Sequence, residues 1–368
     1  MTRPLNALVL GVGGNVSQSI QKALALASVP TRVIAACISP DSAGLYVADR
    51  AYISPLARES GFIPWLLEVC QREQIDAVLS GSEIVLEVLA PQAQAVRERT
   101  GAVCIVSSPE ALATGRDKLR TCRWLEHAGL PVPGYAPLAD VAAVDALLER
   151  CGFPLVAKPR FGKSGDGILT LHDEHDLERV LAAEDLSLRA VIGAPVSAED
   201  LLVQEYLGDP LHEYTAGCFC DRAGALHGSI VLRRSLQAGT TVRAEPGEFP
   251  DVAEVAGAIA TALAPLGPCN VQLRIRDGRP VPFEINPRFS GTTALRARLG
   301  FNEVEASLRH FVLGEPVPRL ASSERRVAVR YWNEIYLRPE AVKQMADSGR
   351  LDGPGAHRVE TEDWAAGG

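Results

Sequence analysis

The sequence lacks several features that would assign it to a specialised class of protein. None of its apolar runs reaches the roughly 20 residues that a membrane-spanning helix needs. Basic residues are not in excess, because 37 lysines and arginines face 45 aspartates and glutamates, giving a formal net charge of −8. An acidic balance disfavours nucleic-acid binding, although net charge alone does not exclude a local basic groove. Since 47% of the 368 residues are hydrophobic, an ordinary core is expected and disorder is excluded as the dominant state.

Aromatic residues and cysteine motifs are also sparse. Aromatics make up 5% of the chain, and the eight cysteines include no CxxC pair. Cys218 and Cys220 have the wrong spacing for a zinc site. Residues 1–4 lead directly into a strand-like run at 5–10, with no signal-peptide pattern. We therefore expect a cytoplasmic protein with buried, reduced thiols and with no membrane or nucleic-acid partner.

Strand-like and helical patterns alternate over the first part of the chain. Short, uniformly apolar strands between amphipathic helices are typical of a parallel sheet that helices cover on both faces. The expected strands are 5–10, 32–37, 76–80 and 103–106, and the expected helices are 16–27, 62–73 and 84–99. The sequence therefore predicts an α/β first domain over residues 1–110.

A different mixture follows, with strands that no longer alternate regularly with helices. We expect helices at 115–128, 141–151 and 252–264, and strands at 154–158, 168–171, 201–207, 213–220, 228–233 and 326–336. Two further strands, 269–275 and 281–285, flank Asp277-Gly278, which is a strong hairpin signal. The chain after residue 336 is polar and glycine-rich, so we expect a frayed terminus.

The first glycine-rich turn only partly matches a dinucleotide-binding fingerprint. Gly11 and Gly13 fit the pattern, but Val16 stands where the third glycine belongs. The second strand ends at Cys37 instead of an acidic residue. A tight turn that serves structure or a small anion is therefore favoured over NAD.

The second glycine-rich segment, Gly162-Lys163-Ser164, ends like a P-loop. Ala157 stands where the first P-loop glycine belongs, and a strand, not a helix, follows Gly165-Asp-Gly167. A hairpin tip with bare backbone N–H groups can still cover phosphates. Lys158, on the preceding strand, can direct its ammonium at them. The alternative is an ordinary flexible hairpin.

The hairpin around Gly278 brings polar side chains together. Side chains alternate along a strand, so Glu284 and Asn286 share one face. A three-residue turn centred on Gly278 would set Gln272 opposite Glu284, whereas a two-residue turn would shift the pairing by one. One carboxylate and two amide oxygens suit Mg²⁺, which keeps waters and takes phosphate oxygens as further ligands. Arg288 follows closely and is suited to a phosphate or acyl-phosphate oxygen; the alternative is an exposed polar sheet face.

Seven separated segments carry a family resemblance. They are Arg116-Asp117-Lys118, Leu155-Val-Ala-Lys158-Pro159, the 160–167 loop, Val203-Gln204-Glu205-Tyr206-Leu207, Glu213-Tyr214-Thr215, Asn270-Val-Gln272 and Glu284-Ile-Asn286-Pro287-Arg288. Their order and content resemble the ATP-grasp superfamily, in particular the branch that contains carbamoyl phosphate synthetase and related amino-acid ligases. The resemblance covers about residues 5–312.

The resemblance implies an α/β protein in which a Rossmann-like parallel sheet precedes a two-lobed α+β ATP-grasp domain. The pre-ATP-grasp domain would span residues 1–110 and the ATP-grasp domain 111–315. Within the latter, a small lid-bearing lobe would cover about 111–203 and a large lobe about 204–315. Residues 316–368 would form a C-terminal extension.

The resemblance also implies a role for each matching residue. The nucleotide would be bound by Lys118, Lys158, the lid residues Gly162, Lys163, Ser164, Gly165 and Gly167, the adenine-binding Glu205, Tyr206 and Leu207, and the ribose-binding Glu213. The metal would be bound by Gln272, Glu284 and Asn286. Arg288, together with Lys158, would stabilise the transferring phosphoryl group. Lys163 and Asp166 in the lid, and an amide at position 272, depart from the usual pattern.

The implied activity is an ATP-dependent carboxylate–amine ligase that releases ADP and phosphate and uses Mg²⁺ or Mn²⁺. Its small-molecule substrates would be amino acids or a small amine, and a homodimer is compatible with this function. Asn15, Glu83 and Arg234 are candidate substrate residues, although an acid at position 83 also suits a helix N-terminus. The alternatives are another acceptor in this fold (bicarbonate or a nucleotide-biosynthesis intermediate), a silent nucleotide sensor, or an NAD(P)-dependent oxidoreductase.

Overall fold

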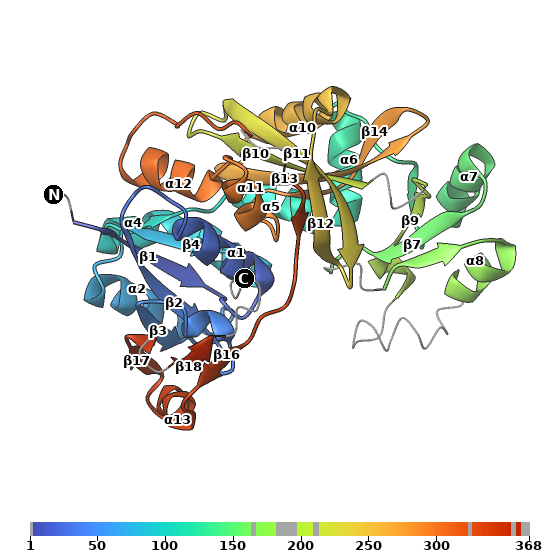
Figure 1. The fold of residues 1–368 in the computed structure, drawn as a ribbon. Helices are drawn as coiled ribbons and strands as arrows, with labels where there is room; N and C mark the ends of the chain where they lie inside the picture. The colour runs from blue at the N-terminus through green and yellow to red at the C-terminus, as the bar shows by residue number, and fades with distance from the viewer. Residues whose placement is uncertain are drawn as a thin grey trace.

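A computed structural model describes residues 3–162, 167–181, 197–208, 213–322 and 326–354, together with the backbone of 358–361. Figure 1 shows the N-terminal domain and the lobe that carries α7 and α8 at opposite ends of the molecule, with a large sheet between them. The C-terminal segment runs back from the large sheet to the N-terminal domain. Among the described residues, no helix combines the length and apolarity that a membrane crossing requires.

The first sheet has the strand order β17-β3-β2-β1-β4-β5. Its elements are β1 (Leu5–Leu10), α1 (Asn15–Leu24), β2 (Thr31–Cys37), η1 (Ala43–Leu45), β3 (Arg50–Ile53), α2 (Phe62–Arg72), β4 (Ala77–Ser80), α3 (Glu83–Leu89), η2 (Ala90–Gln92), α4 (Ala93–Thr100) and β5 (Val103–Cys104). Strands β1 to β5 are parallel, as the sequence predicts. The predicted helix at 84–99 is interrupted at Pro91, where a short helical turn separates α3 from α4.

Both faces of this sheet are buried, which explains why its strands are uniformly apolar. Alternate side chains of β1 enter different cores, with Ala7 and Val9 on one side and Leu8 and Leu10 on the other. The core that contains Ala7 also includes Phe289 and other side chains of the large lobe. The first domain and the large lobe therefore share one continuous core.

The lid-bearing lobe is a smaller sheet with the order β6-β9-β7-β8. The chain reaches it through α5 (Pro109–Arg116) and α6 (Lys118–His127), and it contains β6 (Tyr135–Pro137), α7 (Val141–Cys151), β7 (Leu155–Pro159), β8 (Leu169–Leu171), α8 (Glu174–Leu181), η3 (Ala198–Asp200) and β9 (Leu201–Glu205). The single helix predicted at 115–128 is wrong. Asp117 ends α5 and caps α6, because its carboxylate accepts the backbone N–H groups of Leu119 and Arg120.

The large lobe contains an antiparallel sheet with the order β14-β13-β10-β11-β12-β15. Its elements are β10 (Glu213–Cys220), β11 (Leu226–Gln237), β12 (Thr240–Pro246), α10 (Pro250–Leu263), β13 (Gly267–Arg276), β14 (Arg279–Asn286), α11 (Thr293–Arg298), α12 (Glu303–Ser307), the π-helical turn η5 (Leu308–Val312) and β15 (Ala328–Val329). Helix α10 packs against one face. The sequence reasoning missed β12, which the Ala238-Gly239 turn joins to β11 with positive φ at both residues.

The β13–β14 hairpin reaches the expected pairing by a different route. Its turn has two residues, Asp277 and Gly278, because Arg276 pairs with Arg279. Of the two turn lengths considered from the sequence, the two-residue turn is the one present. A bulge at Phe283, between the pairs Leu273–Pro282 and Gln272–Glu284, shifts the register by one residue. Gln272 consequently lies opposite Glu284, as a three-residue turn would have placed it.

Much of the C-terminal extension consists of helix and strand, while the terminus that was expected to be frayed, residues 362–368, lies outside the described residues. The predicted strand at 326–336 is wrong as one unit, because β15 and β16 (Ile335–Leu337) lie in different sheets. Helix α13 (Pro339–Ser348) leads into β17 (Arg350–Asp352), which pairs antiparallel with β3. Strand β18 (Arg358–Thr361) pairs with β16. The extension therefore joins both the large sheet and the first sheet.

Candidate active site

Lys158 is the buried cation of the site. It lies on β7 with 5% of its surface exposed, and its Nζ lies 5.9 Å from the centre of the Phe283 ring on β14. Burial lowers the pKa of this ammonium to about 8, while the nearby Glu284 carboxylate favours its charged form. The bulge residue Phe283 also lies 5.7 Å from the guanidinium carbon of Arg274. Lys158 therefore lies where the lid-bearing lobe meets the polar face of the large sheet.

The predicted metal ligands converge on one carboxylate oxygen. Oε1 of Glu284 accepts Nε2 of Gln272 at 3.1 Å and Nδ2 of Asn286 at 2.8 Å. Rotation of either amide about its last bond would present an oxygen in place of the nitrogen. No cluster of three His, Cys, Asp or Glu side chains occurs within the described ranges, so the available hard ligands are one carboxylate with amide oxygens. This set fits Mg²⁺ that takes its other ligands from phosphates and water.

Glu213 lies beside this group and is held by two arginines. Its Oε1 accepts Nη2 of Arg234 at 2.7 Å, and its Oε2 accepts Nη2 of Arg274 at 2.8 Å. Arg234 also donates to Oε1 of Gln272 at 2.6 Å. Arg234, predicted as a candidate substrate residue, is thus hydrogen-bonded to Glu213 and Gln272, which the resemblance assigns to ribose and metal binding. Sequence reasoning gave no role to Arg274, although its alternation with Gln272 put it on the same face.

The segment after β9 is fixed by arginines from β13. Arg276 donates to the Tyr206 carbonyl at 2.8 Å and pairs with the Glu205 carboxylate. The Glu205 backbone N–H donates to the Gly134 carbonyl at 2.8 Å, and the side chain of Leu207 is buried. The backbone that the resemblance assigns to adenine is therefore held by hydrogen bonds and an ion pair to residues of both lobes.

Only part of the predicted phosphate lid can be located. Lys118 starts α6, and its Nζ donates to the Gly162 carbonyl at 3.3 Å. Gly167 has a φ of 73°, which a glycine adopts without strain. The predicted lid residues Lys163, Ser164 and Gly165 lie outside the described residues. Lys118 and Lys158 thus lie at the base of the hairpin whose tip was assigned to phosphate.

The first domain contacts the loop after β14 at two points. Glu83, at the start of α3, forms an ion pair with Arg288, whose Nη1 donates to the Phe289 carbonyl at 2.9 Å. Asn15, at the start of α1, lies beside Gly291, where an added Cβ would come within 3.4 Å of Nδ2. We call Asn15, Glu83 and Arg288 the acceptor wall. It brings Glu83 and Arg288, which were predicted independently, into direct contact.

Comparison with known protein families shows what this arrangement resembles. Residues 197–335 match the family described as ATP-grasp in the biosynthetic pathway with Ter operon. This part of the chain is similar to an ATP-grasp domain. Residues 8–104 match the PylC-like N-terminal domain. The expected ATP-grasp resemblance and the expected order of a parallel sheet followed by an ATP-grasp domain are therefore confirmed.

Relatives and solved structures extend this ATP-grasp comparison. The carbamoyl phosphate synthase large chain of Mesorhizobium japonicum is 26% identical over 299 residues, which cover 75% of this chain. The same protein of Myxococcus xanthus is 28% identical over 257 residues, which cover 67% of this chain. The chain spans only 24% and 22% of those relatives. N5-carboxyaminoimidazole synthetase from Staphylococcus aureus, complexed with ADP, has a TM-score of 0.69 at 16% identity, covering 90% of this chain and 83% of that one.

A further structural neighbour carries a metal–nucleotide complex. The biotin carboxylase domain of 2-oxoglutarate carboxylase from Hydrogenobacter thermophilus was solved with MgADP and bicarbonate. It has a TM-score of 0.66 at 15% identity, covering 93% of this chain and 77% of that one. At such identities the likeness concerns the fold.

Behind the polar face of the ATP-grasp sheet lies a buried network that sequence reasoning missed. Arg296 and Glu303 form a fully buried ion pair, and Arg296 Nη1 donates to Oδ1 of Asn270 at 3.1 Å. Asn270 lies opposite Asn286 in the hairpin. A Cβ on Gly217 would come within 2.1 Å of Arg296, so this glycine provides the space for the guanidinium. No local signal distinguishes Arg296 from a surface arginine of an amphipathic helix.

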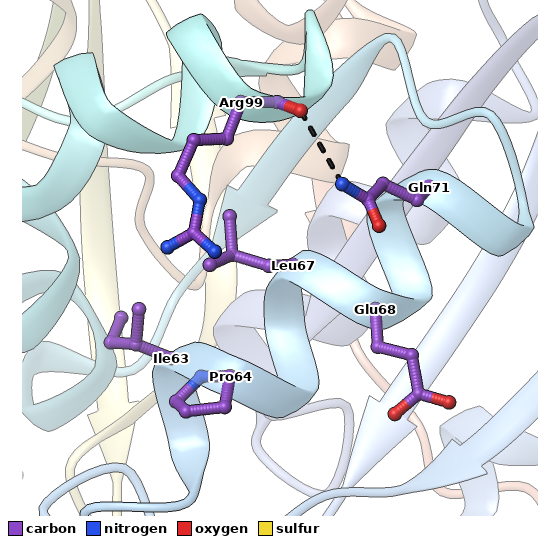
Figure 2. A pocket seen from close by; sticks show the side chains of 6 residues that line it. All are labelled: Ile63, Pro64, Leu67, Glu68, Gln71 and Arg99. Carbon is purple, nitrogen blue, oxygen red and sulfur yellow. Dashed lines mark hydrogen bonds between the residues drawn. The ribbon is translucent and has the colours of Figure 1, made fainter.

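Two other features do not contribute to the ATP-grasp site. The Gly11–Gly14 turn packs closely against the residue that precedes η1, since a Cβ on Gly13 would lie 2.9 Å from Oγ of Ser42. Figure 2 shows a shallow hollow on α2 and the end of α4, lined by Ile63, Pro64, Leu67, Glu68, Gln71 and Arg99. Gln71 donates to the Arg99 carbonyl there at 3.4 Å. None of the predicted site residues lines this hollow.

Proposed function

We propose that this chain is an ATP-dependent carboxylate–amine ligase that works through an acyl phosphate. The observation that carries the proposal is that Lys158 from one lobe lies against Phe283 and near the Glu284 carboxylate of the other, where Glu284 also accepts hydrogen bonds from Gln272 and Asn286. This pairing of a buried ammonium with hard oxygen ligands suits a triphosphate with Mg²⁺ or Mn²⁺ between them. The ADP-bound and MgADP-bound structural neighbours support the same choice of ligands.

The reaction needs positioning and charge neutralisation more than a covalent enzyme nucleophile. A carboxylate oxygen attacks the γ-phosphorus, the bond to the β–γ bridging oxygen breaks, and ADP leaves with that electron pair. An amine nitrogen then attacks the acyl carbon and loses a proton, while inorganic phosphate leaves. Lys158 would neutralise phosphate charge, and Arg288 would exchange Glu83 for the transferring phosphoryl group. When bound, the metal would supply further neutralisation of the phosphate oxygens.

A coupled ADP-release screen with amino acids in pairs, followed by mass detection of the product, tests this proposal. Glu284→Ala should abolish ADP formation because the metal loses its only carboxylate in this set. The matched control is Glu248→Ala, which alters an exposed carboxylate outside the site. Unchanged turnover in Glu284→Ala, with a normal circular dichroism spectrum, would refute the metal assignment.

The second candidate keeps the same first step with bicarbonate as the carboxylate. The bicarbonate-bound neighbour favours including it. The same screen distinguishes the two candidates, because bicarbonate-dependent ADP release without any amino acid would favour the second. A homodimer and a cytoplasmic location remain part of the proposal and are tested by light scattering and by cell fractionation.

A further inference from the structure

Arg330 reaches from the C-terminal extension to the acceptor wall. Its backbone N–H donates to the Val242 carbonyl at 2.8 Å, which fixes the main chain beside β12. Its Nη2 donates to the Gly291 carbonyl at 2.7 Å. Gly291 lies on the same short loop as Arg288. The guanidinium groups of Arg288, on the loop itself, and of Arg330, on the C-terminal extension, therefore both donate to backbone carbonyls of this loop.

Arg330 differs in its charged neighbours from the other buried and half-buried arginines that the structure describes. Within the described ranges, the other arginines that are buried or half-buried each form an ion pair, as Arg234 does with Glu213 and Arg288 with Glu83. Arg330 is half-buried, and no described carboxylate lies within ion-pair distance of it. Burial lowers its pKa from the ordinary value. A cation removed from water in this way is stabilised when a ligand supplies the opposite charge.

The surroundings of Arg330 suit a small polar ligand. The Gly291 carbonyl also accepts Oγ of Ser19 at 3.1 Å, and Asn15 lies directly beside Gly291. Because residue 291 has no side chain, the Asn15 amide lies close to the loop there, 3.4 Å from the position that a Cβ would take. On the other side of the loop, Glu83 and Arg288 provide one charge of each sign. These are the groups that an amino acid, with its own carboxylate and ammonium, would require.

We propose that Arg330 binds a carboxylate of the amine-bearing substrate, which makes that substrate an amino acid and not a neutral amine. The planar guanidinium can hold a carboxylate through two parallel hydrogen bonds. This inference rests on the proposed ligase function. It assigns to the C-terminal extension a binding residue that completes the acceptor wall.

Binding of the common L-amino acids and of their carboxamides to the full-length protein tests this role by calorimetry, with and without Mg²⁺ and a non-hydrolysable ATP analogue. We expect at least one amino acid to bind about tenfold more tightly than its carboxamide. Arg330→Ala should remove that preference, and Arg330→Lys should retain part of it. The control Arg338→Ala, an exposed arginine of the same extension, should retain it fully. A preference that survives Arg330→Ala, or no preference in the wild type, would overturn the proposal.

The ADP-release screen separates this inference from the proposed function. If Arg330→Ala loses the carboxylate preference and the wild type never releases ADP with any substrate pair, the binding role is supported and the ligase function is refuted. ADP release by Arg330→Ala with an unchanged KM for the amino acid would refute the role of Arg330 alone.

Discussion

At Lys158, burial and charge oppose each other. Phosphate binding requires the ammonium form, yet burial lowers the pKa of the free protein's Lys158 to about 8. Above that pH the free protein is mostly neutral at this residue, so nucleotide binding must take up a proton. We therefore expect the affinity for MgATP to fall as the pH rises through 8, with about a tenfold loss at pH 9 relative to pH 7.

Calorimetric titration between pH 6.5 and pH 9.5 checks this dependence. This range extends roughly one pH unit or more on either side of the shifted pKa. Lys158→Arg is the matched variant, because a guanidinium stays charged over this range, and its affinity should be weaker but nearly independent of pH. A wild-type affinity that is flat up to pH 9.5 would contradict the prediction that Lys158, with its lowered pKa, takes up a proton when the nucleotide binds.

Some of these residues could be predicted from the sequence and others could not. Gln272, Glu284 and Asn286 could be grouped because alternation along two neighbouring strands is a local property. The partners of Glu213 could not, because Arg234 lies on a different strand and its pairing depends on how the sheet assembles. Arg296 gave no signal at all, since its burial is decided by the space above Gly217.

The hairpin element shows that turn length alone does not determine the pairing of two strands. Asp277-Gly278 is a two-residue turn with positive φ at both residues, as the dipeptide indicates. The register was nevertheless preserved because Phe283 forms a bulge. Its ring lies near both Lys158 and Arg274. Bulges carry no reliable local sequence signal, so the pairing was predictable while its cause was not.

The tail element can be tested through Leu351 on β17, which is 1% exposed and belongs to the core shared with the first domain. Leu351→Ala should lower the free energy of unfolding by about 2–5 kcal/mol, because it leaves a cavity in a packed core. Urea unfolding followed by circular dichroism measures this loss. The control Leu313→Ala removes a side chain that is 43% exposed and should change stability little. Equal, small effects of both variants would mean that the tail is frayed after all.

At the scale of the whole molecule, the shared core predicts coupled stability. Ile20 of α1 is fully buried in the same core as Ile230 and Leu232 of β11. Ile20→Ala should therefore speed amide hydrogen exchange more than about tenfold in peptides from both β1 and β11. Peptides from β7, whose core is separate, should be unaffected. Hydrogen exchange with mass spectrometry makes this comparison, and acceleration confined to β1 would show that the first domain unfolds independently.

The pairing of β17 with β3 has a consequence for biosynthesis. Until residues 350–352 leave the ribosome, the outer edge of the N-terminal sheet exposes unpaired backbone groups, and such edges recruit other strands. Nascent chains of this protein therefore carry an open edge at β3 from the emergence of residues 50–53 until residues 350–352 have also emerged.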